Sequence, residues 1–350
     1  MTDQTDVQSA ERIQEAYSAI KTEMAKVIVG QDAVIDQLIV ALFARGHCIL
    51  TGVPGLAKTL MISSLSRTLS LDFKRIQFTP DLMPTDITGT ELIQENRDTG
   101  SRDIVFREGP IFTNVLLADE INRTPPRTQA ALLEAMQDRQ VTTGGEVRPL
   151  SDPFFVLATQ NPIEQEGTYP LPEAQLDRFM FNVVVDYPSS DDELEILRRT
   201  SSIESSDLQS IMDGEEIVQL QGLVRRVPIA DEMIHYAMTL VRSTRPDQED
   251  VPVVVQDNLQ WGAGPRAGQY LVLAAKARAV IQGRFHVSME DIQRCARPVL
   301  RHRILTNYSA QAEGLCPDDI IDQLIETVPL HPIRTSHDGG LPEVVGSTDD

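Results

Sequence analysis

The first half of the chain alternates short apolar runs with longer segments of mixed polarity. The runs Cys48–Thr51, Val115–Asp119 and Phe154–Thr159 are apolar almost throughout, which indicates strands buried on both faces. A helix is expected from about Lys58 to Leu69 and a further strand from about Phe73 to Phe78. Buried strands that alternate with helices predict a mostly parallel sheet covered by helices, and so an α/β core.

Two segments interrupt this rhythm with hairpin patterns. In the first, alternating strands around Thr90–Gln94 and Asp103–Arg107 flank a polar turn. In the second, two short strands within residues 140–148 surround the pair Gly144-Gly145. Both patterns are typical of β-hairpins, so we expect two hairpin inserts in the core.

The flanking regions differ from this core. Residues 1–26 predict a helical lead-in with one apolar face, and residues 27–187 form the core. From 188 to 334 the patterns are helical, which predicts a small all-α domain that begins with a capping box at Ser190–Glu193. Residues 335–350 carry the composition of a disordered tail. The apolar face of the lead-in helix consists of Ile13, Tyr17, Ile20 and Met24. The four clearest later helices are predicted at Ile229–Arg242, Ala267–Gln282, Met289–Arg301 (with Ser288 as N-cap) and Asp318–Val328.

The amino-acid composition argues against some classes of function. The 350 residues suffice for about two domains. They carry 31 Lys and Arg against 52 Asp and Glu, a net charge of −21, which argues against a general nucleic-acid surface. The three cysteines have no metal-ligand spacing and are expected to be reduced, mostly buried thiols of a cytoplasmic protein. No signal peptide or membrane span is expected, because no run approaches 18 apolar residues.

The strand Cys48–Thr51 runs into a Gly-rich loop, Gly52–Thr59. Backbone N–H groups of such a loop and of the following helix hold phosphate oxygens, Lys58 neutralises their charge, and the Thr59 hydroxyl binds Mg²⁺. Ala57 stands where a second Gly is usual. A left-handed conformation there would cost about 1–2 kcal/mol, so Gly55 is expected to supply the flexibility instead.

Further polar residues follow buried strands. Asp119 and Glu120 close one strand, where Asp119 can hold the metal and Glu120 can polarise an attacking water. Asn161 follows another strand and is expected to face the same ligand, although an Asx turn before Pro162 explains it as well. The sequence therefore predicts a nucleoside triphosphate site.

Two arginines are candidates for the same chemistry. Arg178 ends the segment Leu171–Phe179, where the alternative is a surface ion pair with Asp177 or a neighbour. Arg266 lies in the first turn of a predicted helix. A cation there opposes the helix dipole, so we expect an anion from outside the helix beside it.

In this order the segments resemble the AAA+ ATPases and, within them, the MoxR family of the helix-2-insert superclade. The resemblance spans residues 20–330 and rests on GVPGLAKT (52–59), VLLADEINR (115–123), ALLEAMQDRQVT (131–142), ATQNP (158–162), LPEAQLDRF (171–179) and GAGPRA (262–267). The two hairpins match the helix-2 insert and the pre-sensor-1 hairpin of that superclade. The resemblance implies an AAA+ core followed by a helical lid domain.

The resemblance also implies roles for single residues. Lys58 and Thr59 would be Walker A residues, Asp119 and Glu120 Walker B, Asn161 sensor 1, Arg178 the arginine finger and Arg266 sensor 2. Thr59 and Asp119 would hold Mg²⁺, and the catalytic set would be Lys58, Glu120, Asn161 and Arg178. The residues expected to contact ATP are Val29 and Gly30 at the adenine, then Gly52, Val53, Pro54, Gly55, Leu56, Ala57, Lys58, Thr59, Leu60, Asp119 and Arg266.

By the same resemblance, the protein is an ATP hydrolase that works as a ring, a homo-hexamer, and remodels or activates partner proteins. Such partners typically carry a von Willebrand factor A domain. Two alternatives stay open: a nucleic-acid motor like the minichromosome maintenance helicases, which would need Lys/Arg clusters on the hairpins, and a non-hydrolysing nucleotide switch, which Glu120 and Arg178 argue against. We assign no role to Arg123, Arg127 or His47, which structural ion pairs or a strand end can explain.

Overall fold

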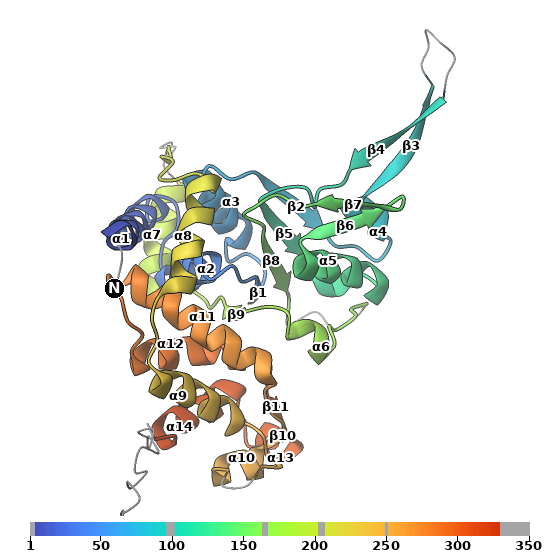
Figure 1. The fold of residues 1–350 in the computed structure, drawn as a ribbon. Coiled ribbons are helices and arrows are strands. Elements are labelled where there is room, and N and C mark those ends of the chain that lie inside the picture. Colours follow the sequence, from blue (N-terminus) through green and yellow to red (C-terminus); the bar gives the residue numbers. More distant parts are fainter. Residues whose placement is uncertain (1–3, 96–101, 163–166, 202–206, 249–250, 330–350) are drawn as a thin grey trace, which may run out of the picture.

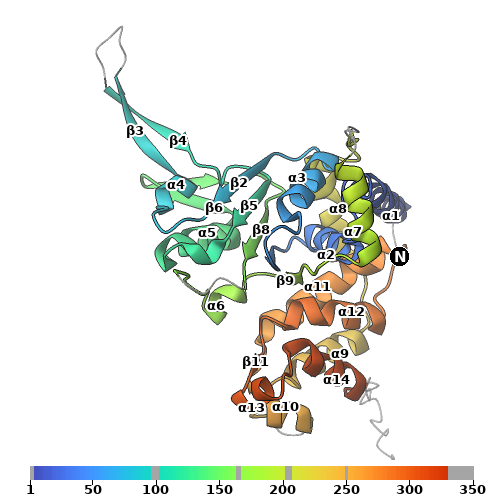
Figure 2. The ribbon, with the colours of Figure 1, turned by 180° about the vertical axis from the view of Figure 1, so that it is seen from behind.

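A computed structural model describes residues 4–95, 102–162, 167–201, 207–248 and 251–329. The expected disorder of residues 335–350 therefore lies outside the described residues. Figure 1 shows an α/β body that carries a projecting two-stranded ribbon and is followed by a group of helices. The same arrangement is seen from behind in Figure 2.

The α/β body is built on one five-stranded parallel sheet, with strand order β2-β5-β8-β1-β9. The alternation of buried strands and helices confirms the predicted architecture. The register sets Gln77, the last residue of β2, opposite Asp119, the last residue of β5. The sheet strands are β1 (Cys48–Thr51), β2 (Phe73–Gln77), β5 (Val115–Asp119), β8 (Phe155–Gln160) and β9 (Phe181–Val184).

Helices cover both faces of this sheet. Because successive side chains of a strand point to opposite faces, Leu116 and Ala118 pack into one apolar cluster and Val115 and Leu117 into another. The first cluster contains α5 (Pro126–Asp138) and the short α4 (Pro84–Thr88). The second contains the helices on the other face, α1 (Gln4–Met24), α2 (Asp32–Phe43) and α3 (Lys58–Thr68).

Both predicted hairpins are present. The longer one, β3 (Gly89–Glu95) and β4 (Arg102–Glu108), is the projecting ribbon of Figure 1. The shorter one, β6 (Gln140–Thr143) and β7 (Glu146–Pro149), lies beside its base. The Arg148 guanidinium stacks on the Phe106 ring with 4.0 Å between the guanidinium carbon and the ring centroid, which joins the two hairpins.

The described chain after residue 188 is helical, as predicted, apart from a two-stranded sheet that the sequence did not indicate, β10 (Leu259–Trp261) with β11 (Leu305–Thr306). The predicted capping box at Ser190 is displaced by one residue: Ser189 is the N-cap and its hydroxyl accepts from the backbone N–H of Asp192. The helices are α7 (Ser190–Thr200), α8 (Gly214–Arg226), α9 (Asp231–Arg242), α10 (Val253–Asn258), α11 (Pro265–Ile281), α12 (Met289–Leu300), α13 (Tyr308–Ala312) and α14 (Pro317–Thr327).

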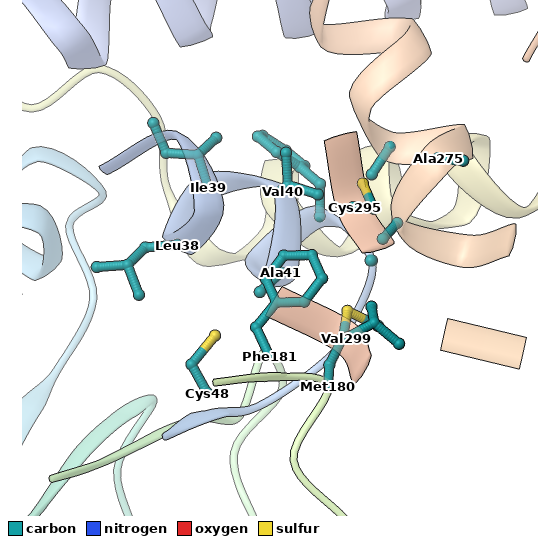
Figure 3. Close-up of a cluster of buried hydrophobic side chains, with 14 of the residues drawn as sticks. Leu38, Ile39, Val40, Ala41, Cys48, Met180, Phe181, Ala275, Cys295 and Val299 are labelled. Atoms are coloured by element: carbon teal, nitrogen blue, oxygen red, sulfur yellow. The ribbon is translucent and has the colours of Figure 1, made fainter. Parts of the chain in front are cut away.

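The helical part and the α/β body share one apolar cluster. Figure 3 shows Val40 and Ala41 of α2 and Phe181 of β9 packed against Cys295 and Val299 of α12. The predicted lead-in helix joins the same cluster, with Ile13, Ile20 and Met24 fully buried. The sheet is thus held between α4 and α5 on one side and a continuous helical layer on the other.

Candidate nucleotide-binding site

The loop between β1 and α3 has a conformation set by three small residues. A side chain at Gly52 would lie 2.4 Å from the carbonyl oxygen of Val185, so only Gly fits there. Gly55 has φ +89° and Ala57 has φ +53°. The expectation that Gly55 would replace a left-handed Ala57 is therefore wrong, because both residues are left-handed. Strain of about 1–2 kcal/mol at a non-Gly residue is typical of functional loops.

Lys58 is the first residue of α3, so the free N–H groups of that helix's first turn face the loop. Its Nζ donates to the Gly52 carbonyl at 2.6 Å. Burial lowers the pKa of the Lys58 ammonium, while the charges of Asp119 and Glu120 oppose this shift. The structure thus brings Lys58 near both carboxylates predicted from the sequence. Thr59 is half-buried in the same turn, while Val53 and Leu56 are half-buried and Pro54 and Leu60 exposed.

Thr159, at the end of β8, organises the two carboxylates. Its hydroxyl donates to Asp119 Oδ1 at 2.5 Å and accepts from the backbone N–H of Glu120 at 2.8 Å. Glu120 has φ +57°, a left-handed conformation that a non-Gly residue rarely adopts. One hydroxyl therefore fixes both the Asp119 carboxylate and the strained backbone that directs Glu120. The sequence analysis gave Thr159 no role, although it lies two residues before Asn161.

Strand β2 adds two polar residues that sequence reasoning also missed. The guanidinium of Arg75 pairs with Asp119 Oδ2 at 2.6 Å, and Gln77 Nε2 donates to Glu120 Oε2 at 2.7 Å. Arg123 pairs with the same Glu120 oxygen at 3.0 Å. The sequence shows only that β2 is rich in polar residues. These residues can be assigned to the site only when β2 is known to lie next to β5.

The parallel sheet gathers these groups at one edge. Asn161 follows the last residue of β8 and is 8% exposed. Because β8 lies between β5 and β1, Asn161 shares the carboxyl edge with Asp119, Glu120 and the loop after β1. Ligands of open parallel sheets bind at the carboxyl edge of the strands. The buried polar side chain of Asn161 therefore lies where a ligand is expected.

Val29 and Gly30, the expected adenine contacts, precede α2. Val29 is half-buried and Gly30 is exposed with φ +73°. A side chain at Gly30 would lie 2.6 Å from the Asp192 carboxylate, so the start of α7 lies against this backbone. The start of α7 therefore forms one wall beside the predicted adenine contacts.

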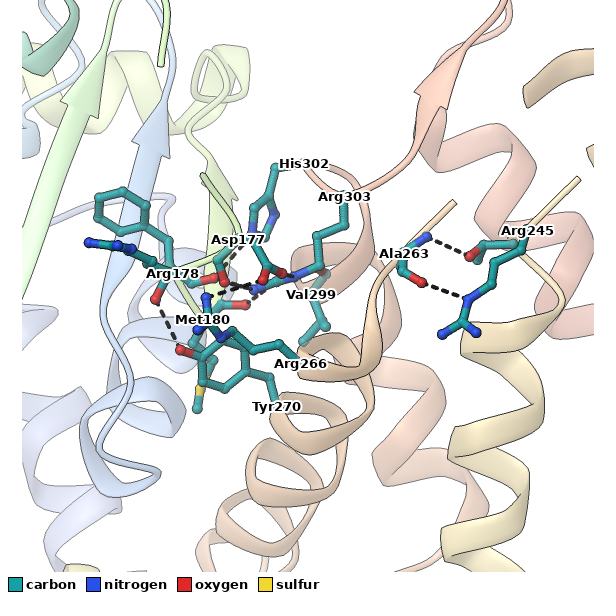
Figure 4. A network of polar contacts seen from close by, with 12 residues as sticks. Asp177, Arg178, Met180, Arg245, Ala263, Arg266, Tyr270, Val299, His302 and Arg303 are labelled. Atoms are coloured by element: carbon teal, nitrogen blue, oxygen red, sulfur yellow. Dashed lines mark hydrogen bonds and ion pairs between the residues drawn. The ribbon is translucent and has the colours of Figure 1, made fainter. Parts of the chain in front are cut away.

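Arg266 and Arg178 belong to a separate cluster, shown in Figure 4. Arg266 pairs with Asp177 Oδ2 at 3.2 Å, while Arg303 pairs with Asp177 Oδ1 at 2.8 Å. The expected anion beside Arg266 is thus a carboxylate of the same chain. The alternative of an Arg178–Asp177 pair is wrong, because Asp177 pairs with the other two arginines and Arg178 points away from it (Figure 4). Tyr270 donates to the Arg178 carbonyl at 3.0 Å and holds its backbone.

A pocket of about 500 Å³ lies beside this cluster. Asp177, Trp261 and Arg303 line it, and none of its lining residues, all within the described part of the chain, belongs to the loop after β1. The structure therefore groups the predicted site residues in two places: the loop, acid pair and Asn161 at the sheet edge, and Arg178 with Arg266 around Asp177.

The residues given no role have structural partners or lie exposed. His47 Nδ1 accepts from the backbone N–H of Val156 at 3.0 Å, and its Nε2 lies 3.3 Å from the Met136 carbonyl. Burial lowers the pKa of the His47 imidazole to about 4. Arg127 is exposed in the first turn of α5. Arg123, by contrast, contacts Glu120 directly.

The candidate metal donors are the Thr59 hydroxyl and the Asp119 carboxylate. Hydroxyl and carboxylate oxygens suit Mg²⁺, which is usually held by one or two protein oxygens together with phosphates. Within the described ranges, no group of three or more His, Cys, Asp or Glu could hold a metal alone. The donor set therefore fits Mg²⁺ that arrives with a nucleotide. None of the helices in the described residues is long and apolar enough to cross a membrane.

Comparison with known proteins agrees with this geometry. Residues 47–181 match the model of the ATPase family associated with various cellular activities (AAA), and residues 253–324 match the AAA lid domain. Chaperone MoxR1 of Mycobacterium tuberculosis is 40% identical over 88% of this chain and 80% of its own length. Protein MoxR of Methylorubrum extorquens is 31% identical over 90% and 95%.

A crystal structure of a predicted ATPase from Cytophaga hutchinsonii is 41% identical, with a TM-score of 0.85 over 93% of this chain and 98% of that one. The combination of an AAA core, an AAA lid and similarity to MoxR proteins over most of the chain agrees with the motifs of the sequence. The chain belongs to the MoxR family of AAA ATPases.

Proposed function

We propose that this protein hydrolyses ATP with Mg²⁺ and uses the resulting conformational change to remodel or activate partner proteins. The observation that carries the proposal is the placement of Lys58, Asp119 and Glu120 at one sheet edge, with Thr159 joining the two acids. Phosphoryl transfer to water requires a cation that binds the phosphates, a carboxylate for the metal and a second carboxylate for the water.

Each residue has a distinct task in this mechanism. Lys58 and the N–H groups of the loop and of the first turn of α3 bind the β- and γ-phosphates. Thr59 and Asp119 would hold Mg²⁺, which when bound would neutralise charge on the phosphates. Glu120 accepts a hydrogen bond from the attacking water, and Asn161 positions that water. Asp119 Oδ2 is paired with Arg75, so a metal held at this oxygen would displace the guanidinium.

The contacts of Glu120 indicate which of its oxygens meets the water. Gln77 and Arg123 both donate to Oε2. Oε1 is then the oxygen that accepts from water. We infer that Gln77 and Arg123 are positioning residues that set the rotamer of the base.

We further propose that Arg178 and Arg266 act on the nucleotide of a neighbouring subunit in a homo-hexameric ring. Support comes from the ion pair of Arg266 with Asp177, which holds Arg266 beside the Arg178 segment, next to a pocket that no residue of the chain's own phosphate loop lines. A guanidinium supplied in trans stabilises charge on the transferred phosphoryl group.

The surface favours protein partners over nucleic acid. Ile93 and Ile104 are cross-strand neighbours on the projecting ribbon and are 74% and 70% exposed. An aliphatic pair of this kind suits contact with a client protein, and the net charge of −21 opposes phosphate backbones. We propose clients with von Willebrand factor A domains and a cytoplasmic ring, since the buried free thiols of Cys48 and Cys295 suit a reducing compartment.

The variant Glu120→Gln tests this function. The amide keeps the shape of the side chain and removes a negative charge near the phosphates, so ATP should bind at least as tightly while hydrolysis stops. The locked variant should retain clients in a pull-down from which Lys58→Ala, unable to hold nucleotide, recovers none. Hydrolysis by Glu120→Gln at the rate of the unmodified protein would refute the proposal. DNA binding at physiological salt that stimulates hydrolysis would favour the nucleic-acid motor.

A further inference from the structure

A groove of about 800 Å³ lies between α9 and α11, on the helical part of the chain. Val241, Val272 and Leu273 contribute to its apolar lining, and Ile234 and Met238 leave 41% and 46% of their surface exposed there. The volume is in the range of grooves that take a ligand or a short peptide segment. The nucleotide site uses none of these residues.

The charged residues of this groove are all arginines: Arg225, Arg242 and Arg245. Arg242 and Arg245 donate to the uncharged partners Gln248 Oε1 and the Ala263 carbonyl, both at 3.0 Å. The residues that line the groove are all described, and no acid occurs among them, although the chain has 52 acidic residues. An aliphatic occupant with negative charges therefore complements the groove.

The C-terminal residues of the same chain begin close to this groove and have the required composition. The described residues end at Pro329, which lines a second groove together with Met238 and Arg242, and these two residues also line the first groove. Residues 330–350 contain four acids and a single Arg, with Leu341, Val344 and Val345 between Asp338 and Asp349. The eleven residues 330–340 span at most about 36 Å, which is ample for neighbouring grooves.

We propose that the segment 338–345 of the same chain docks in the groove between α9 and α11. Its aliphatic residues cover the apolar lining, and Asp338 and Glu343 meet the arginine rim. Because the segment is tethered next to the groove, its effective concentration is high and a weak contact is enough for occupancy. The docking is independent of the proposed ATP chemistry, so either idea can fail alone.

A photo-crosslinking amino acid in place of Val344, in the full chain, tests this docking. Crosslinks mapped by mass spectrometry should join residue 344 to peptides of α9 or α11 in a species of single-chain mass. Gly268→Leu should abolish them, because Gly268 lines the groove and an added Cβ there meets only Val241, at 4.0 Å, so the leucine fits on the helix and fills the groove. The matched control is Gly222→Leu on α8, a position that does not line the groove and where an added Cβ would meet only Arg226, at 3.8 Å.

Charge reversal adds a second test. Arg242→Glu should lower the crosslink yield about two- to fivefold, because an exposed charge pair changes a binding equilibrium by about this factor. Glu343→Arg in the same chain should restore the yield. Crosslinks that avoid the groove, or a yield that Gly268→Leu leaves unchanged, would overturn the proposal. Crosslinks found only in a species of twice the chain mass would assign the groove to a second copy and would overturn it as well.

Discussion

Arg266 in the first turn of α11 forms an ion pair with Asp177, the residue immediately before Arg178, with 3.2 Å between Nη1 and Oδ2. The same carboxylate pairs with Arg303, whose side chain is 2% exposed. One carboxylate of the α/β body thus ties two arginines of the helical part to the segment that carries Arg178.

Asp177→Asn should destabilise the protein, because it leaves the buried Arg303 guanidinium without a countercharge. Asp177 is partly exposed, so we expect a loss of about 1–3 kcal/mol in the free energy of unfolding, measured by urea denaturation, less than the full cost of breaking a buried pair. Glu173→Gln at an exposed position of the neighbouring short helix α6 (Glu173–Leu176) should leave stability unchanged. Equal stability of the two variants would contradict the role given to Asp177.

Thr159→Val should slow ATP hydrolysis about 10- to 100-fold while ATP still binds. The substitution keeps the volume of the side chain and removes the hydroxyl that serves Asp119 and the Glu120 backbone, and an unsatisfied buried N–H costs about 1–3 kcal/mol. Thr159→Ser keeps the hydroxyl and is the matched control, which should retain most of the activity. If valine and serine behaved alike in steady-state turnover, the hydroxyl would have no positioning role.

Gln77→Ala should lower kcat and leave ATP affinity unchanged, because it frees Glu120 without touching the phosphate loop. We expect about a tenfold loss, the value of one hydrogen bond to a charged group. The double variant with Arg123→Ala should lose more, since both residues hold Oε2. Lys74→Ala on the same strand, whose Nζ donates to the Phe112 carbonyl, is the control. An effect on affinity alone would contradict the assignment.

The contacts around Glu120 and around Asp177 could be predicted from the sequence only in part. Four strands of the parallel sheet, the two hairpins and most of the longer helices followed from polarity patterns, and the loop and acid pair from their spacing. Strand β9 and the β10–β11 pair were not predicted. The roles of Arg75 and Gln77 depend on the strand order, which sets β2 against β5 although Gln77 and Asp119 lie 42 positions apart in the sequence. Arg303 meets Asp177 across 126 positions. The left-handed Ala57 was unforeseen because surrounding packing, and not local preference, decides that conformation.

His47 should remain neutral down to about pH 4, where burial places the pKa of its imidazole. The folded state therefore binds fewer protons than the unfolded state between about pH 6.5 and pH 4, and His47 contributes stability above this window that is lost as the pH falls through it. Histidine-ring NMR should show a His47 signal with its proton on Nε2, since Nδ1 accepts from Val156. Protonation of that ring near pH 6.5 in the folded protein would contradict the burial argument.

The central claim, an ATP site completed by a neighbouring subunit, is tested most directly by mixing two inactive variants. Lys58→Ala cannot hold nucleotide but still presents Arg178, while Arg178→Ala holds nucleotide but presents no guanidinium. A missing arginine finger costs about 10³–10⁵ in rate, so each variant alone should be nearly inactive. After co-assembly is demonstrated, the mixture should regain ATP hydrolysis at interfaces that pair an intact Lys58 with an intact Arg178. Activity equal to the sum of the two separate variants would contradict the shared site.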